Sequence, residues 1–273
     1  MYTILISLLV GILVGLGCGY GDVASPFFSV LWGVVAALLA YGLAMLHFRR
    51  VLNGRMTQIQ QIMVDGQKQI QARVNVLQTR PTGNPNQMIR ELEKMQGRLI
   101  RQSLDETAGL ESLIGWVPLL SRQIATMRMQ FHYQLKEFDK VDELLPRCLM
   151  LDPLSMAMKL ARMYRRKEPL EEQRKFFDRS VARLKYNQGA LMYSLMAWIL
   201  LQEKQDDEAH KVMLAAAKNT ENDLIKRNLD RLANNRPREF SNAGLGDEWY
   251  ALHLEQPKVN IKRQHARHAG RPF

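Results

Sequence analysis

Apolar and polar positions divide the chain near residue 48. Before that point the only charged side chain is Asp22, whereas later residues alternate apolar and charged positions at helical spacing. Two apolar runs, 1–20 and 27–47, lie in the first part. A helix of about 20 residues is roughly 30 Å long, which matches the hydrocarbon core of a bilayer. The pattern predicts a transmembrane hairpin of two helices, joined by the short outer loop 21–26.

Small residues recur at every fourth position in both apolar runs. The first run has Gly11, Gly15 and Gly19, and the second has Gly33 and Ala37. Small side chains let two helix backbones approach closely in lipid, where the hydrophobic effect does not drive helices together. We expect these residues to pack the two helices against each other. Association between chains through the same faces is the alternative.

Basic residues set the expected orientation of the hairpin. Arg49, Arg50 and Arg55 follow the second run, whereas the loop between the runs offers only Asp22. Positive charge next to a span favours the cytoplasmic side. The first run lacks the basic segment of a signal peptide, and a second apolar run follows it at once. The sequence therefore predicts a bacterial-type inner (cytoplasmic) membrane protein with two spans, and with both termini and the soluble domain in the cytoplasm.

The region 48–110 has imperfect heptads. Apolar residues recur at steps of three and four from Leu52 to Leu77, and again from Met88 to Leu99. Between these stretches, 79–87 contains two Pro, one Gly and two Asn, which is typical of a turn. The pattern predicts an amphipathic, coiled-coil-like stalk. Its helices either fold back within one chain or pair between two chains, and a helix lying on the membrane surface is a third interpretation.

Composition argues against an enzyme. All 38 Lys and Arg follow the apolar part, and the chain has only two Cys, so it has neither a disulfide framework nor zinc-type spacing. No phosphate loop, nucleophile elbow or zinc-protease motif is present, and the glycine-rich segment 15–21 lies at the edge of an apolar run. His265 and His268 have no acid or Cys nearby. We expect no catalytic residues, no cofactor and no metal site.

The region 111–235 is helical in pattern and contains two stretches in phase. In the first, from Arg122, the residues concerned are Val141, Leu145, Cys148 and Pro153; in the second, from Ala190, they are Tyr193, Ala197, Ala209, Met213 and Ala216. Val141 and Ala209 lie two lengths of about 34 residues apart. Both stretches resemble the tetratricopeptide repeat (TPR), with a degenerate unit between them. The resemblance implies an all-α fold, in which helix pairs stack into a TPR-like α-solenoid.

The resemblance also implies a peptide-binding groove lined by the first helix of each pair. Carried over to the first unit, the groove residues are Gln123, Thr126, Met127, Gln130, Tyr133 and Gln134. In the later unit they are Leu191, Ser194, Leu195, Trp198, Leu201 and Gln202. The Lys and Asn residues with which some family members clamp a carboxylate terminus are absent. Simple packing of Trp198 and Leu201 against a neighbouring helix is the alternative.

The region 236–273 changes in character. Trp249, Tyr250, Leu252 and Leu254 predict a short docked helix or strand, which covers the exposed end of the solenoid or serves as a linear motif for a partner. The last stretch has no acid, and we expect a disordered basic tail that touches anionic lipid or RNA. Its cations are Lys258, Lys262, Arg263, Arg267 and Arg271.

These features together predict a membrane-anchored, TPR-like adaptor or scaffold. It would bind or assemble partner proteins at the cytoplasmic face of the inner membrane, with a protein or peptide ligand, the lipid bilayer and a second copy of the chain as expected partners. One alternative is a membrane-tethered contact with nucleic acid or the ribosome through the basic tail, although no RNA-reading motif accompanies it. Another is a purely structural membrane oligomer.

Overall fold

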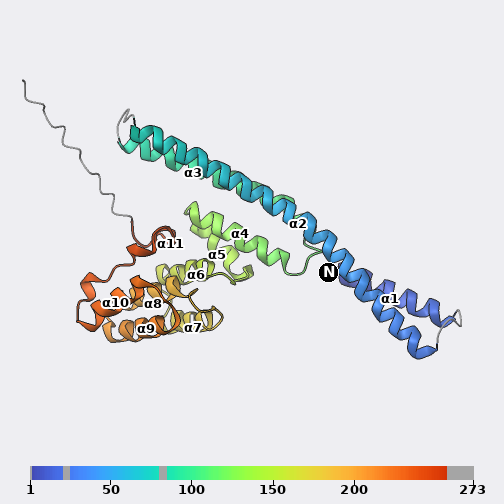
Figure 1. Cartoon of the computed structure of the whole chain (residues 1–273). Coiled ribbons are helices and arrows are strands. Elements are labelled where there is room, and N and C mark those ends of the chain that lie inside the picture. Colours follow the sequence, from blue (N-terminus) through green and yellow to red (C-terminus); the bar gives the residue numbers. More distant parts are fainter. Residues whose placement is uncertain (1, 21–24, 80–84, 257–273) are drawn as a thin grey trace, which may run out of the picture. The chain divides into compact units, whose positions relative to one another are not determined.

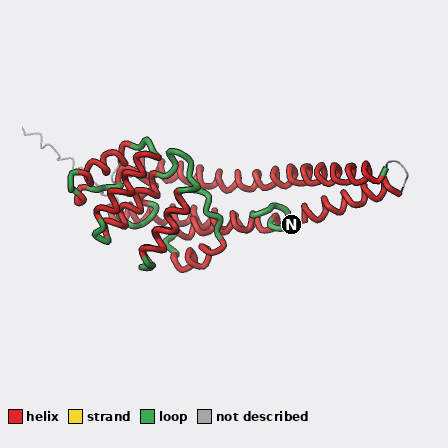
Figure 2. The backbone as a smooth tube through the Cα atoms, turned by 90° about the horizontal axis from the view of Figure 1, so that it is seen from below, coloured by secondary structure: helices red, strands yellow, loops and turns green. Residues whose placement is uncertain are grey.

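A computed structural model describes residues 2–20, 25–79 and 85–256 of the chain. Every regular element in these ranges is a helix, which confirms the predicted all-α class (Figures 1 and 2). The chain forms two compact units, Met1–Met150 and Leu151–Phe273. The sequence suggests divisions at 110/111 and 235/236, whereas the structure divides the chain within the region expected to hold the repeats.

The first unit begins with two helices, each long and apolar enough to cross a membrane. They are α1 (Tyr2–Tyr20) and α2 (Pro26–Thr79). Pro26 is the first residue of α2, where its missing N–H removes no helical hydrogen bond. The 54-residue α2 continues without a break from the second apolar run into the predicted stalk. Most apolar side chains of both runs are exposed, among them Leu5 and Leu39.

Glycines bring α1 and α2 into close contact. A Cβ atom placed on Gly11 would lie 2.7 Å from both the Ala37 Cβ atom and the Gly33 carbonyl oxygen. A Cβ atom on Gly33 would likewise lie 2.7 Å from the Gly11 carbonyl oxygen. The predicted stripe of small residues therefore lies at a contact between two helices of the same chain.

Helix α3 (Pro85–Glu106) packs along α2 within the chain. Arg73 of α2 pairs with Glu91 of α3 at 2.9 Å, and a side chain on Gly66 would overlap Leu99. The two predicted stalk helices thus contact each other inside one molecule. Most of the predicted turn at 79–87 lies outside the described residues.

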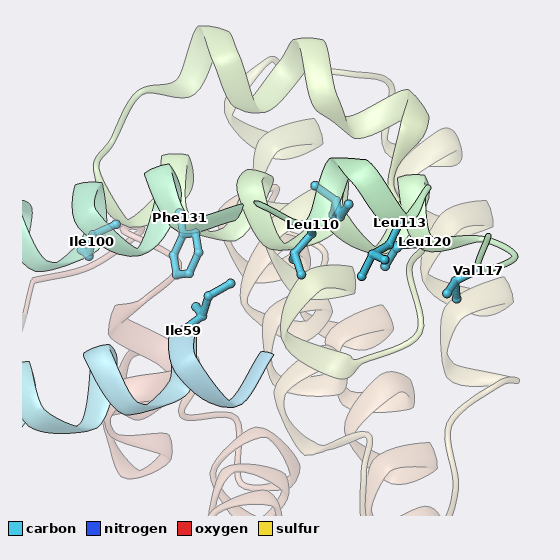
Figure 3. Packing of buried hydrophobic residues seen from close by; sticks show 8 residues of the cluster. Ile59, Ile100, Leu110, Leu113, Val117, Leu120 and Phe131 are labelled. Carbon is cyan, nitrogen blue, oxygen red and sulfur yellow. The ribbon is translucent and has the colours of Figure 1, made fainter. Parts of the chain in front are cut away.

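The core of the first unit joins the stalk helices to η1 (Thr107–Leu113) and α4 (Leu120–Gln134). Two short elements, α5 (Phe138–Leu144) and η2 (Leu145–Arg147), pack against α4. Ile59 of α2 and Phe131 of α4 point toward each other in this core (Figure 3). Phe48, Leu52, Met56 and Met63 of α2 pack against it. The imperfect heptads are explained by this shared core, because one side of α2 meets several elements rather than one partner helix.

The second unit consists of five longer helices followed by short turns. The helices are α6 (Pro153–Arg165), α7 (Leu170–Val181), α8 (Ala190–Gln202), α9 (Asp206–Asn219) and α10 (Asp223–Ala233). After them come η3 (Pro237–Glu239), η4 (Ala243–Leu245) and α11 (Asp247–Tyr250). Helix α8 is the centre of this unit, since nine of its 13 residues are buried and it packs against α6, α7 and α9.

The same C-terminal cap ends α4, α6, α8 and α10. Each helix is followed by a residue with positive φ: Lys136, Lys167, Lys204 and Asn235. The amide of the next residue then donates to a carbonyl five positions back, as from Glu137 to His132 and from Gln205 to Leu200. This pair of features defines a Schellman motif. Because three of the four positive-φ residues are Lys rather than Gly, the repetition is not visible in the sequence.

Candidate protein-binding site

The segment 240–255 lies on the face of α8 that the TPR resemblance assigns to a binding groove. Asn242 is fully buried, and its Nδ2 atom donates to the Ser194 carbonyl oxygen of α8 at 3.0 Å. Asn228 of α10 holds the segment from the other side, donating to the Asn242 Oδ1 atom at 3.3 Å and to the Ser241 carbonyl oxygen at 3.1 Å. An asparagine bridge thus fixes the start of the segment to two helices.

A carboxylate between two indole rings holds the end of the segment. The two carboxylate oxygens of Glu255 accept hydrogen bonds from the Nε1 atoms of Trp198 and Trp249, each at 2.8 Å. The two indole rings meet edge to face with centroids 5.8 Å apart, and Tyr164 of α6 meets Trp198 in the same way at 5.3 Å. Trp249 is completely buried. Since an indole N–H needs an acceptor when it is buried, Glu255 satisfies both rings.

The groove residues predicted on α8 are therefore largely covered by the chain itself. Leu191, Ser194 and Leu195 are buried, Trp198 and Leu201 are partly buried, and Gln202 is exposed. The segment 240–255 covers this face through the Asn242 contact near the middle of α8 and the Trp198 contact one turn later.

Three of the six groove residues predicted on α4 contribute to the interior of the first unit. Thr126 is buried, and its Oγ1 atom accepts from the Leu149 amide at 2.8 Å. Tyr133 is 1% exposed and meets Phe138 edge to face. Met127 packs against the core of the first unit. Of the remaining three residues, Gln123 is exposed, and Gln130 and Gln134 are partly buried.

The residues predicted to pack the repeats differ between the two units. In the second unit Tyr193, Ala197, Ala209, Met213 and Ala216 are all buried at or near the contact of α8 with α9. In the first unit Val141 is fully buried. Leu145 and Cys148 of the same unit are only partly buried, as is Pro153, which already belongs to the second unit.

The second helix of the first pair is short because of a proline. The helix α5 ends at Leu144, and Pro146 follows in the 3₁₀ turn η2. A proline has no N–H for the helix ladder, and its ring crowds the preceding turn. The positions that match the family's second helix at Leu145 and Cys148 therefore lie in and after η2. Pro153 is instead the first residue of α6, which Asp152 caps by accepting from the Ser155 amide at 2.8 Å.

A cavity of about 450 Å³ opens beside the C-terminal end of α8. Tyr164, Arg165, Gln173 and Glu203 are among the residues that line it. Gln173 is 4% exposed; its Nε2 atom donates to the Glu168 carbonyl oxygen at 2.7 Å, but its Oε1 atom has no partner in the described structure. Arg165 donates to the His253 carbonyl oxygen at 3.0 Å, so the segment 240–255 borders this cavity.

Some charged groups of this unit form ion pairs at its surface, among them Glu208 with Arg174 and Lys211. The pKa of the Glu208 carboxyl is lowered by hydrogen bonds from Lys211 and Arg174. Burial raises the pKa of the Tyr193 phenol, which accepts from the Asn219 Nδ2 atom at 3.2 Å. No group of three His, Cys, Asp or Glu that could hold a metal is found among the described residues. The five cations of the predicted basic tail lie outside those residues.

Sequence reasoning missed the residues that hold the segment 240–255 in place. No local pattern marks Asn228, Asn242 and Glu255, because each contacts a residue 13 or more positions away. Asn228 contacts Ser241, Asn242 contacts Ser194, and Glu255 contacts Trp198. Comparison with family models, curated proteins and solved structures finds no match for this chain.

Proposed function

We propose that this protein is a membrane-anchored adaptor or scaffold. In this proposal α1 and the apolar part of α2 cross the inner membrane as a hairpin, and both termini face the cytoplasm. The helix pairs α4–α5, α6–α7 and α8–α9 are TPR-like units that hold a partner protein at the membrane. No catalytic step and no cofactor are part of the proposal.

The exposed apolar surface of α1 and α2 supports the anchor. Side chains such as Leu5, Leu13, Leu38 and Leu43 are 60–69% exposed. A continuous apolar surface of this kind is unfavourable in water but matches the lipid interior. The Tyr2 amide donates to the Gly115 carbonyl oxygen at 2.8 Å, and Trp116 stacks on Phe48. The start of α1 and the end of the apolar run in α2 thus meet the same loop, as a hairpin requires.

The repeated caps support the assignment of helix pairs. The helices α4, α6 and α8 each end in a Schellman motif and are each followed by a shorter or similar helix that packs back on them. Ala209 is fully buried at the α8–α9 crossing, where the TPR resemblance expects a small residue.

The proposal rests on the packing of the segment 240–255 against α8. This face holds a chain segment by one backbone contact, at Ser194, and by aromatic and carboxylate contacts at Trp198. TPR-type grooves bind segments of other proteins on the corresponding helix. We propose that a partner segment with an aromatic residue and a carboxylate competes with 240–255 for the same face.

The proposal is tested by affinity capture from detergent-solubilised native membranes. Asn242→Ala combined with Glu255→Ala loosens the segment and should increase the amount of one specific partner. Trp198→Ala should lower it, because that ring is part of the face itself. Glu248→Gln is the matched control, since Glu248 is an exposed acid of the same segment. Circular dichroism checks that each variant is folded.

Two outcomes would move the function elsewhere. Equal capture by all four proteins would exclude the α8 face as the binding face. Capture that survives Trp198→Ala but is lost on truncation after Gln256, and that weakens steeply with salt, would instead assign the function to the basic tail.

A further inference from the structure

A second cavity, of about 420 Å³, lies in the first unit between α4 and η2. Three arginines line it, Arg122 and Arg128 from α4 and Arg147 from η2. Its wall also contains the apolar side chains of Ile114, Ile124 and Leu144. A cavity that combines guanidinium groups with an apolar wall is suited to a ligand that is anionic at one end and apolar at the other.

Two of the three arginines form no ion pair with a carboxylate among the described residues. Arg128 pairs with Glu111 at 2.7 Å and donates to the Thr107 hydroxyl at 2.8 Å. Arg122 and Arg147 are exposed, and in the described part of the chain neither pairs with a carboxylate. Guanidinium groups bind phosphate oxygens through paired N–H donors, so two free ones at the rim of a cavity favour a phosphate group.

The cavity lies beside the loop that meets the ends of both apolar runs. Ile114 lines the cavity and precedes Gly115, whose carbonyl oxygen accepts from the Tyr2 amide. Trp116 follows, with its ring 5.4 Å from Tyr2 and stacked 4.6 Å from Phe48. Tyr2 begins α1, and Phe48 directly follows the second apolar run. Tyr and Trp gather at the level of lipid headgroups, which is where this cluster would lie if the hairpin spans a membrane.

The same loop exposes apolar side chains. Ile114 is 39% and Leu119 is 56% exposed, although the adjacent Leu120 is buried. Leu119 has φ 61°, a left-handed conformation that is unfavourable for a leucine. Exposed apolar side chains next to an interfacial aromatic cluster have a natural environment at the boundary between headgroups and acyl chains.

We infer that this cavity binds the phosphate group of an anionic phospholipid. Arg122 and Arg147 bind the phosphate oxygens, Ile114 and Leu119 contact the upper acyl chains, and the Tyr2–Trp116–Phe48 cluster sets the depth. The inference rests on the proposed membrane anchor. It adds a specific lipid site, distinct from the general attraction of a basic surface to a membrane.

The test uses the full-length chain, extracted in mild detergent, stripped of lipid and offered phosphatidylglycerol, phosphatidylcholine or inorganic phosphate. Native mass spectrometry counts the molecules that stay bound. We expect a retained phosphatidylglycerol that phosphatidylcholine does not replace, and a roughly tenfold loss of its occupancy in Arg122→Gln/Arg147→Gln. The control variant Arg90→Gln/Lys94→Gln removes two exposed charges from α3 and should bind like the wild type.

Each other outcome overturns the inference and says which part fails. Equal loss in both double variants means unspecific attraction between charges, and retention in both means that the cavity is not the site. Binding of inorganic phosphate that displaces the lipid assigns the cavity to free phosphate. Flotation with neutral vesicles tests the anchor separately. A chain that floats but retains no lipid contradicts only the inference, whereas one that does not float contradicts the proposed anchor as well. Arg122→Lys/Arg147→Lys should recover part of the binding, because it keeps both positive charges, and circular dichroism checks that the Gln variant is folded.

Discussion

Helices α4 and α8 have the same position in the TPR resemblance but different surroundings in the structure. One side of α4 enters the core that it shares with α2 and α3, where Phe131 meets Ile59. Helix α8 is apolar on nearly all sides, and its assigned binding face is covered by the segment 240–255. One pattern of paired helices thus serves two purposes in this chain. In the first unit it completes the core that α4 shares with α2 and α3, and in the second it holds a chain segment.

The largest expected effect separates these two roles. Trp249→Ala removes a fully buried ring from the segment over α8 and should cost about 3–5 kcal/mol of stability in the second unit. Phe131→Ala should do the same in the first unit. Hydrogen exchange on the full chain, read by mass spectrometry, should show lost protection in α8 for the first variant and in α4 for the second.

Tyr186→Ala is the control for these two variants, because Tyr186 is 58% exposed and its loss should change little. If Trp249→Ala deprotects α4 as much as α8, the two helices do not have separate roles and the comparison fails.

A smaller effect is expected where α8 crosses α9. Ala209→Leu places three extra carbons into a contact where Ala209 is fully buried, and overpacking of this kind costs about 1–3 kcal/mol. Ala233→Leu adds the same carbons at the exposed end of α10 and should have little effect. Thermal unfolding followed by circular dichroism compares the two. An unchanged melting temperature for Ala209→Leu would count against a close helix crossing, and so against the repeat assignment.

The first unit has another close helix contact, between α2 and α3. Gly66→Val would push a side chain into Leu99, whereas Gly54→Val on the same helix meets nothing within 4 Å. Because Leu99 can change its rotamer, we expect a loss of only about 1 kcal/mol. The measurement is the difference in denaturant midpoint between the two variants in one detergent. Equal midpoints would mean that α2 and α3 do not need each other, which favours the alternative of stalk helices that pair between chains.

The sequence predicted the helices better than it predicted their partners. Local signals give the approximate bounds of α1, α2 and α3: the length of the apolar runs, Pro26, and the turn residues near 80. Pro146 is also a local signal, because a proline favours the early end of α5. The TPR resemblance instead placed Leu145 and Cys148 within the second helix of the pair. The seat of 240–255 on α8 depends on contacts between Asn242 and Ser194, 48 positions apart. Neither periodicity nor composition carries information about such a contact.

The repeated caps allow a direct test of equivalence between α4 and α8. Lys136 and Lys204 both have φ 58°, in the left-handed region that favours glycine. Lys136→Gly and Lys204→Gly should each relieve this strain and stabilise the chain by about 0.5–1 kcal/mol. The higher conformational entropy of the unfolded chain that contains glycine offsets part of this gain. Lys218→Gly, inside the last turn of α9, should destabilise it. A gain at only one of the two caps would show that the motifs are not equivalent.

The smallest expected effect is electrostatic and specific to the end of α4. Glu137 accepts a hydrogen bond from Lys140 at 3.0 Å and contacts the His132 Nδ1 atom at 2.8 Å. These two contacts, Lys140 first, lower the pKa of the Glu137 carboxyl.

A carboxyl whose pKa is lower in the folded than in the unfolded state stabilises the fold at pH values above its unfolded-state pKa. This stabilisation is lost as the pH falls through the folded-state pKa. Glu137→Gln should therefore reduce the free energy of unfolding near pH 7 by less than about 1 kcal/mol, since the group is partly exposed, and so lower the melting temperature slightly. The difference from wild type should shrink as the pH falls below 4.5, the ordinary pKa of the carboxyl. Gln205 takes the same place after α8 and has no charge to lose, so Gln205→Glu is a matched variant that should show no such network. A melting-temperature difference for Glu137→Gln that stays constant across this pH range would attribute the effect to packing at the cap, and the charge network would then not distinguish α4 from α8.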